Sequence, residues 1–486
     1  MSHVPPVMSG PPVLPGEQPP AWLQDRFALQ RAARWTVARS SVAERRALLQ
    51  RLYSAIKAQR GPLAAALARD LGKSRAEAEL SELRPVLDEL RHLRHHLAGW
   101  MRPQRVATPP ILAGSRSEIQ SQPQGQVLVM SPWNYPFYLA IMPVVGALAA
   151  GNTVMLKPSE KAPHTAQALQ RLLEGVVPPT LVSVVQGDAA VAQALLELPF
   201  DHFFYTGGAR VGRLVMEAAA RHHARVTLEL GGKSPAVVDA TADLPLAARR
   251  IAWSKFVNAG QTCVAPDYVL VHESVEEQLL LQLDGEIGRL FGGPAWQRHG
   301  PDYARIVDGP AVERLDRLCR ESVAQGARVV TGGQFDVAGR FVAPTLLADV
   351  RPDMPLMQEE IFGPLLPVLG YRTLDQAVAQ VQGQQPLALY VFSRDEGAVQ
   401  RFEQDTTSGG LVVNGALIHL SNPNLPFGGV GTSGLGGYHG LHSFRTFSHQ
   451  RAVVREPRVS PVALVYPPYG RLAHRLSAWA LRRLGH

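Results

Sequence analysis

Gln126-Val-Leu-Val-Met-Ser-Pro-Trp-Asn-Tyr-Pro136 is the stretch of sequence that decides the fold. Its first half is an apolar run typical of a buried strand, and its second half is a proline-flanked turn. Similar apolar runs follow, separated by helical patterns, at 153–156, 181–186, 202–205 and 225–229. Strands that alternate with helices are typical of a parallel, doubly wound sheet. The sequence therefore predicts an α/β fold.

Helical and strand-like patterns extend this fold in both directions. Over residues 22–100 apolar side chains recur at helical spacing, and Ser41 with Glu44 forms an S-x-x-E capping box. After the first sheet the alternation resumes, with strand-like runs at 236–238 and 268–271. We therefore expect a helical N-terminal segment, a first parallel sheet and a second α/β unit of similar size.

Composition and charge exclude several classes of protein. Of the 486 residues, 46% are hydrophobic and 19% are charged, close to the averages for globular proteins. The net charge is +8, but residues 451–486 hold seven arginines against one glutamate, so the rest of the chain is nearly neutral. A basic face that follows a phosphate backbone is not indicated, and we expect no nucleic-acid partner.

The two cysteines, Cys263 and Cys319, are too few for a disulfide framework and fit a reducing compartment. No N-terminal stretch has the layout of a secretory signal. The apolar stretch 137–156 is interrupted by Pro143 and Gly151, which leaves a run too short for a bilayer. We therefore expect a cytoplasmic protein and, because no metal-ligand motif such as H-E-x-x-H occurs, no metal.

Two residues of opposite chemistry mark a candidate reaction centre. Cys263 ends the motif Asn-Ala-Gly-Gln-Thr-Cys on a turn between a helix and a strand, where a ligand can reach its thiol. Most free cysteines are nonetheless small buried hydrophobic residues. Glu229 lies at the end of an apolar strand, before Leu-Gly-Gly. An acid there is a surface charge, a helix N-cap, or a general base whose pKa is raised by apolar walls.

Turns after the first strands of the sheet are candidate ligand-binding positions. Asn134 either closes an Asx-turn or donates a hydrogen bond to the oxyanion that forms when a thiolate attacks a carbonyl. The glycine-containing turn 205–212 would aim helical N–H groups at a phosphate, although such turns are common and this one lacks the G-x-G-x-x-G pattern. Lys157 and Glu160 add a cation and a carboxylate suited to ribose hydroxyls.

Six motifs in this order resemble those of the aldehyde dehydrogenase superfamily, over roughly residues 22–455: PWNYP, KPSE, YTGG, LELGGKSP, GQTC and EEIFGP. Within the superfamily, NAGQTCVAPDY, LPFGGVG and YHGLHSFRTFSHQR are similar to the class 3 branch. The resemblance implies NAD(P)-dependent oxidation of aromatic or medium- and long-chain aliphatic aldehydes to carboxylic acids. It also implies a homodimer.

The resemblance assigns a role to each motif residue. Cys263 would be the nucleophile that forms a thiohemiacetal and then a thioester, and Asn134 with the Cys263 backbone N–H would form the oxyanion hole. Glu229 would be the general base, although Glu360 would also approach the site, so the identity of the base stays open. The NAD or NADP cofactor would be bound by Trp133, Lys157, Glu160, Thr206, Gly207, Gly208, Val211, Gly212, Leu230, Gly231, Glu360 and Phe362.

The resemblance also divides the chain into domains. A Rossmann-type cofactor-binding domain would comprise 21–102 and 125–230, and an α/β catalytic domain 231–412. A small β element for bridging or oligomerisation would comprise 103–124 and 413–455. The leader, residues 1–20, is rich in proline and is expected to be disordered.

The C-terminal segment 456–486 is a basic tail with an amphipathic pattern. Its apolar and basic positions would form opposite helix faces, Leu472, Leu476, Trp479 and Leu484 against Arg471, Arg475, Arg482 and Arg483. Such a tail either stays solvated or packed in the dimer, or lies on an anionic membrane surface.

Other functions remain as alternatives. A CoA-acylating dehydrogenase would share the thioester step, although no distinct CoA-binding pattern occurs. A non-catalytic scaffold of the same fold would be expected to lack Cys263, Asn134 or Glu229, and all three are present. A cysteine hydrolase would need a partnered imidazole and no nucleotide-binding turn.

Overall fold

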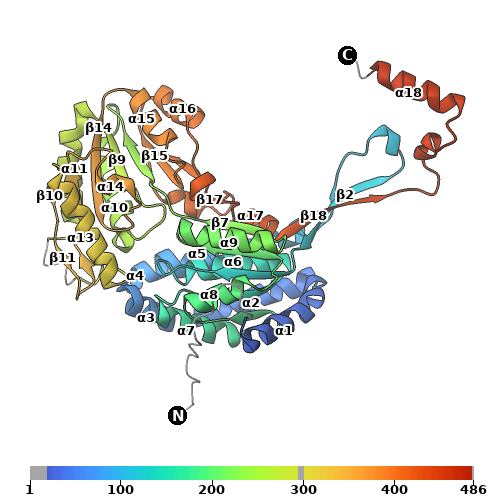
Figure 1. Ribbon diagram of the computed structural model, residues 1–486, viewed down its shortest axis with the longest axis horizontal. Helices are drawn as coiled ribbons and strands as arrows, with labels where there is room; N and C mark the ends of the chain where they lie inside the picture. The colour runs from blue at the N-terminus through green and yellow to red at the C-terminus, as the bar shows by residue number, and fades with distance from the viewer. Residues whose placement is uncertain (1–18, 294–299, 484–486) are drawn as a thin grey trace, which may run out of the picture.

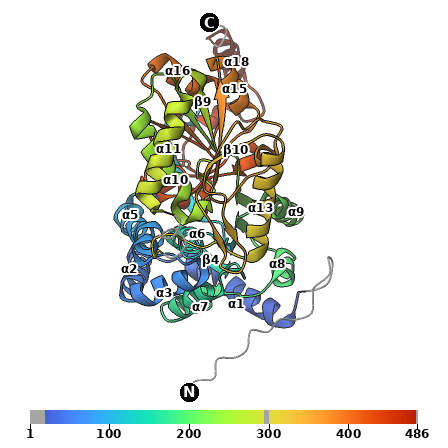
Figure 2. The same ribbon diagram turned by 90° about the vertical axis from the view of Figure 1, so that its left-hand side faces the viewer.

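The computed structural model describes residues 19–293 and 300–483. They form two α/β lobes and an extended ribbon that leaves the body on one side (Figure 1). The lobes lie one above the other when the molecule is turned by 90° (Figure 2). The leader predicted over residues 1–20 lies almost wholly outside the described residues.

The N-terminal segment is helical, as predicted. The Ser41 side chain accepts from the Glu44 backbone N–H while the Glu44 carboxylate accepts from the Ser41 backbone, so the predicted capping box is present. A short π-helical turn, η1, lies between the helix that ends at Ala78 and the helix that begins at Arg84. The elements are α1 Ala21–Ala38, α2 Val42–Ala58, α3 Arg60–Leu71, α4 Arg75–Ala78, η1 Glu79–Leu83 and α5 Arg84–Trp100.

The first lobe contains a sheet in the order β17-β7-β6-β3-β4-β5. The five predicted strands are present and run parallel: β3 Gln126–Met130, β4 Thr153–Lys157, β5 Val182–Val184, β6 His202–Thr206 and β7 Arg225–Glu229. Because the strand order reverses between β3 and β6, the loops that follow these two strands flank the crevice where such sheets bind ligands.

Helices cover both faces of this first sheet. Alternate strand residues point to opposite faces, so Val127 packs with the layer of α2, α5, α6 and α7, whereas Leu128 packs with α1, α8 and α9. Burial on both faces explains why the strands are continuous apolar runs. The connecting helices are α6 Tyr138–Ala150, α7 Pro163–Glu174, α8 Ala189–Leu196 and α9 Ala209–Arg221.

The second lobe is built around a sheet in the order β10-β13-β14-β9-β8-β15-β16, parallel except for β10 at one edge. Asp243 caps the predicted helix α10 through its side chain. The strands are β8 Pro235–Val238, β9 Tyr268–His272, β10 Arg328–Thr331, β13 Thr345–Ala348, β14 Leu365–Tyr371, β15 Ala388–Phe392 and β16 Gly410–Val413. The helices are α10 Leu244–Phe256, α11 Glu276–Phe291, α13 Gly309–Ala324, α15 Leu374–Gln382 and α16 Glu396–Asp405.

The ribbon consists of β2 Arg116–Pro123 paired along its length with β18 Ser448–Arg455, and β1 Gln104–Arg105 lies at its edge. Of the range 413–455, only β18 joins this ribbon. β17 Gly434–Leu435 pairs with β7 in the first sheet, and α17 Gly440–Thr446 packs against α5 and α6. Apolar side chains explain this distribution, because Phe444 and Phe447 are buried in the first lobe.

The tail continues from the ribbon and ends in α18 Arg471–Arg483, which lies away from both lobes (Figure 1). Leu484, predicted on the apolar face of this helix, lies outside the described residues. Within 19–293 and 300–483, no helix is long and apolar enough to span a bilayer.

Candidate functional site

The predicted site residues converge from separate loops. Asn134 follows β3, Glu229 is the last residue of β7, and Cys263 follows the short helical turn η3 Val257–Gly260 after α10. Burial raises the pKa of the Cys263 thiol, and the carboxylates of Glu360 and Glu229 both lie close enough to raise it further. The fold therefore brings the cysteine, the amide and two acids to one place.

The turn that carries Cys263, residues 257–263, is called the cysteine turn below. Asn258 and Ala259 have φ angles of 54° and 51°, and Gly260 has 74°. These left-handed conformations are costly for residues with a Cβ. At Gly260 a Cβ would lie 2.3 Å from the backbone oxygen of Gly363, so only glycine fits. Packing against the 363 segment thus forces the sharp turn that presents Cys263.

Asn134 is buried and hydrogen-bonded to the cysteine turn. Its Nδ2 donates to the backbone oxygen of Gln261 at 3.0 Å, and Nδ2 of Asn258 donates to the same oxygen at 3.1 Å. The Asn134 side chain therefore bridges two loops, and among its hydrogen bonds to described residues none closes an Asx-turn. An amide nitrogen carries two hydrogens, so a second N–H remains for a ligand.

Burial of Glu229 excludes two of its three predicted roles. The side chain is 3% exposed, so it is not a surface charge, and the next element is β8, so there is no helix for it to cap. Among the described residues neither carboxylate oxygen has a hydrogen-bond partner, and burial raises the pKa of this carboxyl well above its usual value. Such an acid is suited to accept a proton.

Glu360 approaches the same centre from the second lobe. Burial, with a contribution from Asp267, raises the pKa of Glu360 to about 8. Its carboxylate occupies the space beside Gly231, where any Cβ would overlap it. Burial also raises the pKa of the Cys263 thiol to about 12, so the resting thiol is protonated at neutral pH and needs a nearby acceptor for its proton.

A cavity of about 530 Å³ opens onto Cys263. Its walls come from η1, α5 and α6 of the first lobe, from α10 and α11 of the second, and from the 417–427 segment. Three apolar side chains that line it are also exposed at the surface: Leu80 by 73%, Trp253 by 45% and Ile418 by 58%. Arg84, Asp302 and Ser421 are exposed in the same lining, so the cavity connects the thiol to a partly apolar rim.

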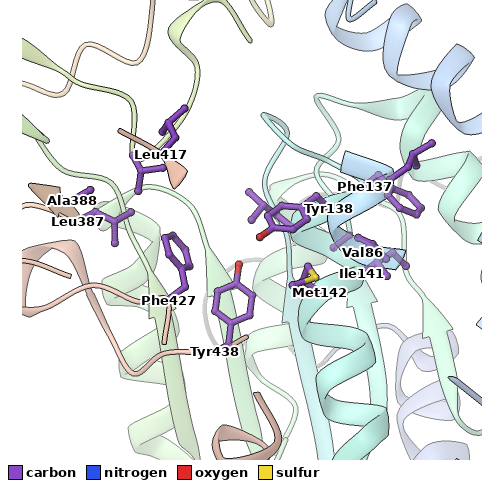
Figure 3. Close-up of a cluster of buried hydrophobic side chains, with 14 of the residues drawn as sticks. Val86, Phe137, Tyr138, Ile141, Met142, Leu387, Ala388, Leu417, Phe427 and Tyr438 are labelled. Atoms are coloured by element: carbon purple, nitrogen blue, oxygen red, sulfur yellow. The ribbon is translucent and has the colours of Figure 1, made fainter. Parts of the chain in front are cut away.

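Aromatic and polar side chains missed by sequence reasoning line or border this cavity. Figure 3 shows Tyr138 and Met142 opposite Phe427 and Tyr438. The Tyr138 hydroxyl forms a 3.0 Å hydrogen bond with Nε2 of His439, a residue more than three hundred positions later in the chain. No local pattern predicts a contact over that separation. The aromatic residues that follow Asn134 in the sequence do indicate the wall of the cavity that contains Tyr138.

The candidate cofactor residues lie at the carboxyl ends of β4, β6 and β7. Lys157 Nζ is 2.5 Å from the half-exposed Glu160 carboxylate, which can accept from ribose hydroxyls. α9 starts after Gly207 and Gly208 with no acidic residue in its first turn, and a Cβ at Gly208 would meet nothing within 4 Å. An open helix N-terminus of this kind suits a phosphate.

The other candidate cofactor residues complete this surface. The Thr206 hydroxyl is buried and has no hydrogen-bond partner within the described part of the chain. Gly212 lets α9 approach β7, because a Cβ there would lie 2.8 Å from Leu230 Cδ2; Val211 is half-buried beside it. Trp133 and Phe362 meet edge to face, with ring centroids 5.4 Å apart. These features fit a dinucleotide.

Comparison with known families gives a match over most of the chain. A family model described as the aldehyde dehydrogenase family matches residues 26–453. A solved structure described as the substrate-bound state of Staphylococcus aureus AldH superposes with a TM-score of 0.90 at 40% identity, over 94% of this chain and 99% of that one.

Three curated relatives are similar over nearly their whole lengths. The 4,4'-diaponeurosporen-aldehyde dehydrogenase of Staphylococcus aureus is 42% identical, over 92% of this chain and 96% of its own. The dimeric NADP-preferring aldehyde dehydrogenase of Rattus norvegicus is 43% identical, over 86% and 92%. Aldehyde dehydrogenase family 3 member A2 of Pongo abelii is 41% identical, over 86% of each chain.

Proposed function

Because this chain belongs to the aldehyde dehydrogenase family, we propose that it oxidises apolar, aromatic or medium- and long-chain aldehydes through a thioester on Cys263. The observation that carries the proposal is that Cys263 lines a cavity with a partly apolar rim, close to two buried acids and to Gln261, whose backbone oxygen accepts from the Asn134 amide.

The first step is addition of the Cys263 thiolate to the aldehyde carbon. The thiol proton passes to a nearby carboxylate, Glu229 or Glu360, whose raised pKa makes it a competent acceptor, and it is released to solvent before water is activated. As the C–S bond forms, the carbonyl π electrons move to oxygen. Asn134 Nδ2 and the Cys263 backbone N–H donate hydrogen bonds to that oxyanion. The product is a thiohemiacetal.

NAD or NADP, held by the residues at β4, β6 and α9, supplies the hydride acceptor when bound. The C–H bond of the thiohemiacetal then breaks and its hydride would pass to that acceptor, while the oxyanion reforms the carbonyl and a thioester remains on Cys263. Glu229 takes a proton from water, the resulting hydroxide adds to the thioester carbon, and the C–S bond breaks to release the carboxylic acid and the thiolate. Glu229 is suited to this role because no described residue competes for its oxygens.

The apolar side chains of the rim support an apolar substrate. Leu80, Trp253 and Ile418 are exposed where the cavity opens, which fits an aldehyde with a hydrocarbon tail that extends beyond the 530 Å³ interior. The Staphylococcus aureus relative is named for 4,4'-diaponeurosporen-aldehyde, and the rat relative is named as NADP-preferring.

We further propose a cytoplasmic homodimer whose basic tail can rest on an anionic membrane surface. The rat relative is named as dimeric. The β2–β18 ribbon stands away from the lobes and offers exposed strands to a second copy (Figure 1). Both cysteines are free thiols, which suits a reducing compartment.

The test is formation of reduced cofactor, measured by its near-ultraviolet absorbance with NAD or NADP and with acetaldehyde, benzaldehyde or dodecanal. We expect turnover with the two larger aldehydes and loss of at least about a thousandfold in Cys263→Ala. Cys319→Ala is the matched control, because Cys319 is buried in the second lobe on α13, and it should keep wild-type activity. Turnover by Cys263→Ala would disprove the proposal.

A further inference from the structure

A fully buried ion pair lies against the segment that carries Asn134. Lys73 Nζ is 2.6 Å from Glu82 Oε1, and both side chains are 0% exposed. Removing two charges from water costs several kcal/mol for each ion, and a buried pair is often no more stable than apolar residues of similar volume. Stability alone is therefore a poor explanation for this pair.

The pair is bonded to both ends of the segment that carries Asn134. Lys73 Nζ donates to the backbone oxygen of Asn134 at 3.0 Å and lies 3.9 Å from the centre of the Tyr135 ring. On the other side, Glu82 Oε2 accepts from the backbone N–H groups of Phe137 and Tyr138, at 2.9 and 3.0 Å. Residues 134–138 are thus held by one cation and one carboxylate.

A second acid of the same region holds the cysteine turn. Glu77 Oε1 accepts from the backbone N–H of Asn258 at 2.9 Å. Nδ2 of Asn258 in turn donates to the backbone oxygen of Asn134 at 2.9 Å. The Asn134 backbone oxygen therefore accepts hydrogen bonds from both Lys73 and Asn258. These bonds fix Asn134 relative to Gln261, whose backbone oxygen accepts from the Asn134 side chain.

The local helix geometry explains how Glu82 reaches this position. Glu82 lies within η1, the π-helical turn Glu79–Leu83 between α4 and α5. A π-turn inserts one residue into a helix and turns the side chains that follow, and such turns are frequent at functional sites. Glu79, in the same turn, instead forms a more exposed pair with Arg60.

We propose that Lys73 and Glu82 are positioning residues for the oxyanion hole. They hold the Asn134 loop so that its free amide N–H points at the oxygen of the substrate bound to Cys263. This inference rests on the proposed function, because it requires an oxyanion at that place. A displacement of about 1 Å in such a donor can cost roughly a hundredfold in rate.

The test compares Lys73→Met, Glu82→Gln and the double variant with the wild type. Each single variant leaves one unpaired buried group and is expected to melt earlier; the double variant should regain most of the melting temperature. Its kcat should still fall by roughly 10- to 100-fold with a KM for benzaldehyde within about threefold of wild type, because the lost interaction acts in the transition state.

Two further readouts separate positioning from folding. Alkylation of Cys263 by iodoacetamide forms no oxyanion, so its rate should remain within about twofold of wild type in the double variant. In an Asn134→Ala background, Glu82→Gln should lower kcat by less than about threefold, because the residue through which it acts is already gone. Arg60→Met with Glu79→Gln is the matched control from the same π-turn and should leave kcat unchanged.

Glu82→Asp keeps both charges but withdraws the carboxylate from the Phe137 and Tyr138 N–H groups, and a fall in kcat of about tenfold or more is expected. Wild-type kcat in a folded double variant, or in Glu82→Asp if the double variant does not fold, would overturn the inference. If Asn134→Ala itself keeps wild-type kcat, the oxyanion role fails and with it the proposed mechanism. If kcat falls in Asn134→Ala but stays at the wild-type value in the double variant and in Glu82→Asp, only the positioning role is rejected.

Discussion

Glu229 has a buried carboxyl group without a hydrogen-bond partner among the described residues, and burial raises its pKa well above the usual value. A base with a raised pKa is still protonated, and inactive, at pH values where an ordinary glutamate is ionised. The kcat of the wild type should therefore rise with pH at values above those at which an ordinary glutamate ionises.

Substitution of Glu229 should stop the reaction at the thioester. In Glu229→Gln we expect a burst of about one reduced cofactor per site, followed by a steady rate lower by roughly 10²- to 10⁴-fold. Rapid mixing with absorbance detection measures both phases. Glu360→Gln is the comparison: normal turnover in Glu229→Gln together with a burst in Glu360→Gln would move the base to Glu360.

The candidate site residues could be predicted from the sequence, but the residues they contact could not. The lone cysteine, the acid at a strand end and the amide after the first strand all stand out. The choice between an Asx-turn and a bridging amide at Asn134 depends on Gln261, 127 positions away. Lys73 and Glu82 left no signal, because charged residues on helical patterns are ordinarily solvated.

Among the elements, α5 and α17 meet through a buried acid that makes stability depend on pH. Glu89 of α5 accepts a hydrogen bond from the Gly440 backbone N–H, and burial raises the pKa of Glu89 to about 7. Between the usual glutamate pKa and about 7, the folded chain keeps a proton that the unfolded chain has lost. The contribution of Glu89 to stability therefore falls as pH rises through that window.

Glu89→Gln retains the acceptor for Gly440 but cannot ionise. Its melting temperature should exceed that of the wild type by a margin that widens from pH 5 to pH 7.5 and then levels off, corresponding to at most about 3 kcal/mol. Thermal unfolding of both proteins across this pH range measures the margin. A margin that does not change with pH would show that Glu89 does not titrate in the folded state there.

Strands buried on both faces were predictable because their apolar runs are continuous, and the structure confirms the parallel α/β arrangement. The sequence did not show that the elements after residue 413 belong to different parts of the fold. β17 has only two residues, and its pairing with β7 depends on Gly434, where a Cβ would lie 2.4 Å from the Leu228 oxygen. The π-turn at 79–83 likewise arises from tertiary contacts, since its sequence suits an ordinary helix.

For the whole molecule, the resemblance to the aldehyde dehydrogenase superfamily and its class 3 branch is confirmed by the family match and the relatives. Motifs scattered between residues 132 and 451 could be recognised because their order is specific. The position of the tail could not be predicted, since it depends on the path of the ribbon that carries it.

The tail gives a prediction about membranes. The full chain should sediment with vesicles that contain anionic lipid and lose this binding at high salt, whereas a chain ending at Pro457 should stay in solution. Arg471→Gln with Arg475→Gln, at full length, is the control for charge without truncation and should bind weakly. Equal sedimentation of the full and shortened chains would reject a membrane role for the tail.

The contact between Glu89 and Gly440 joins residues 351 positions apart, so the first lobe is completed by a segment made much later. At roughly 5–20 residues per second, the ribosome needs roughly 20–70 seconds to make the intervening segment. During that time the nascent first lobe lacks β17 and α17, and the wall that will bear His439 does not yet exist. The reaction centre therefore cannot close until residue 440 has been made.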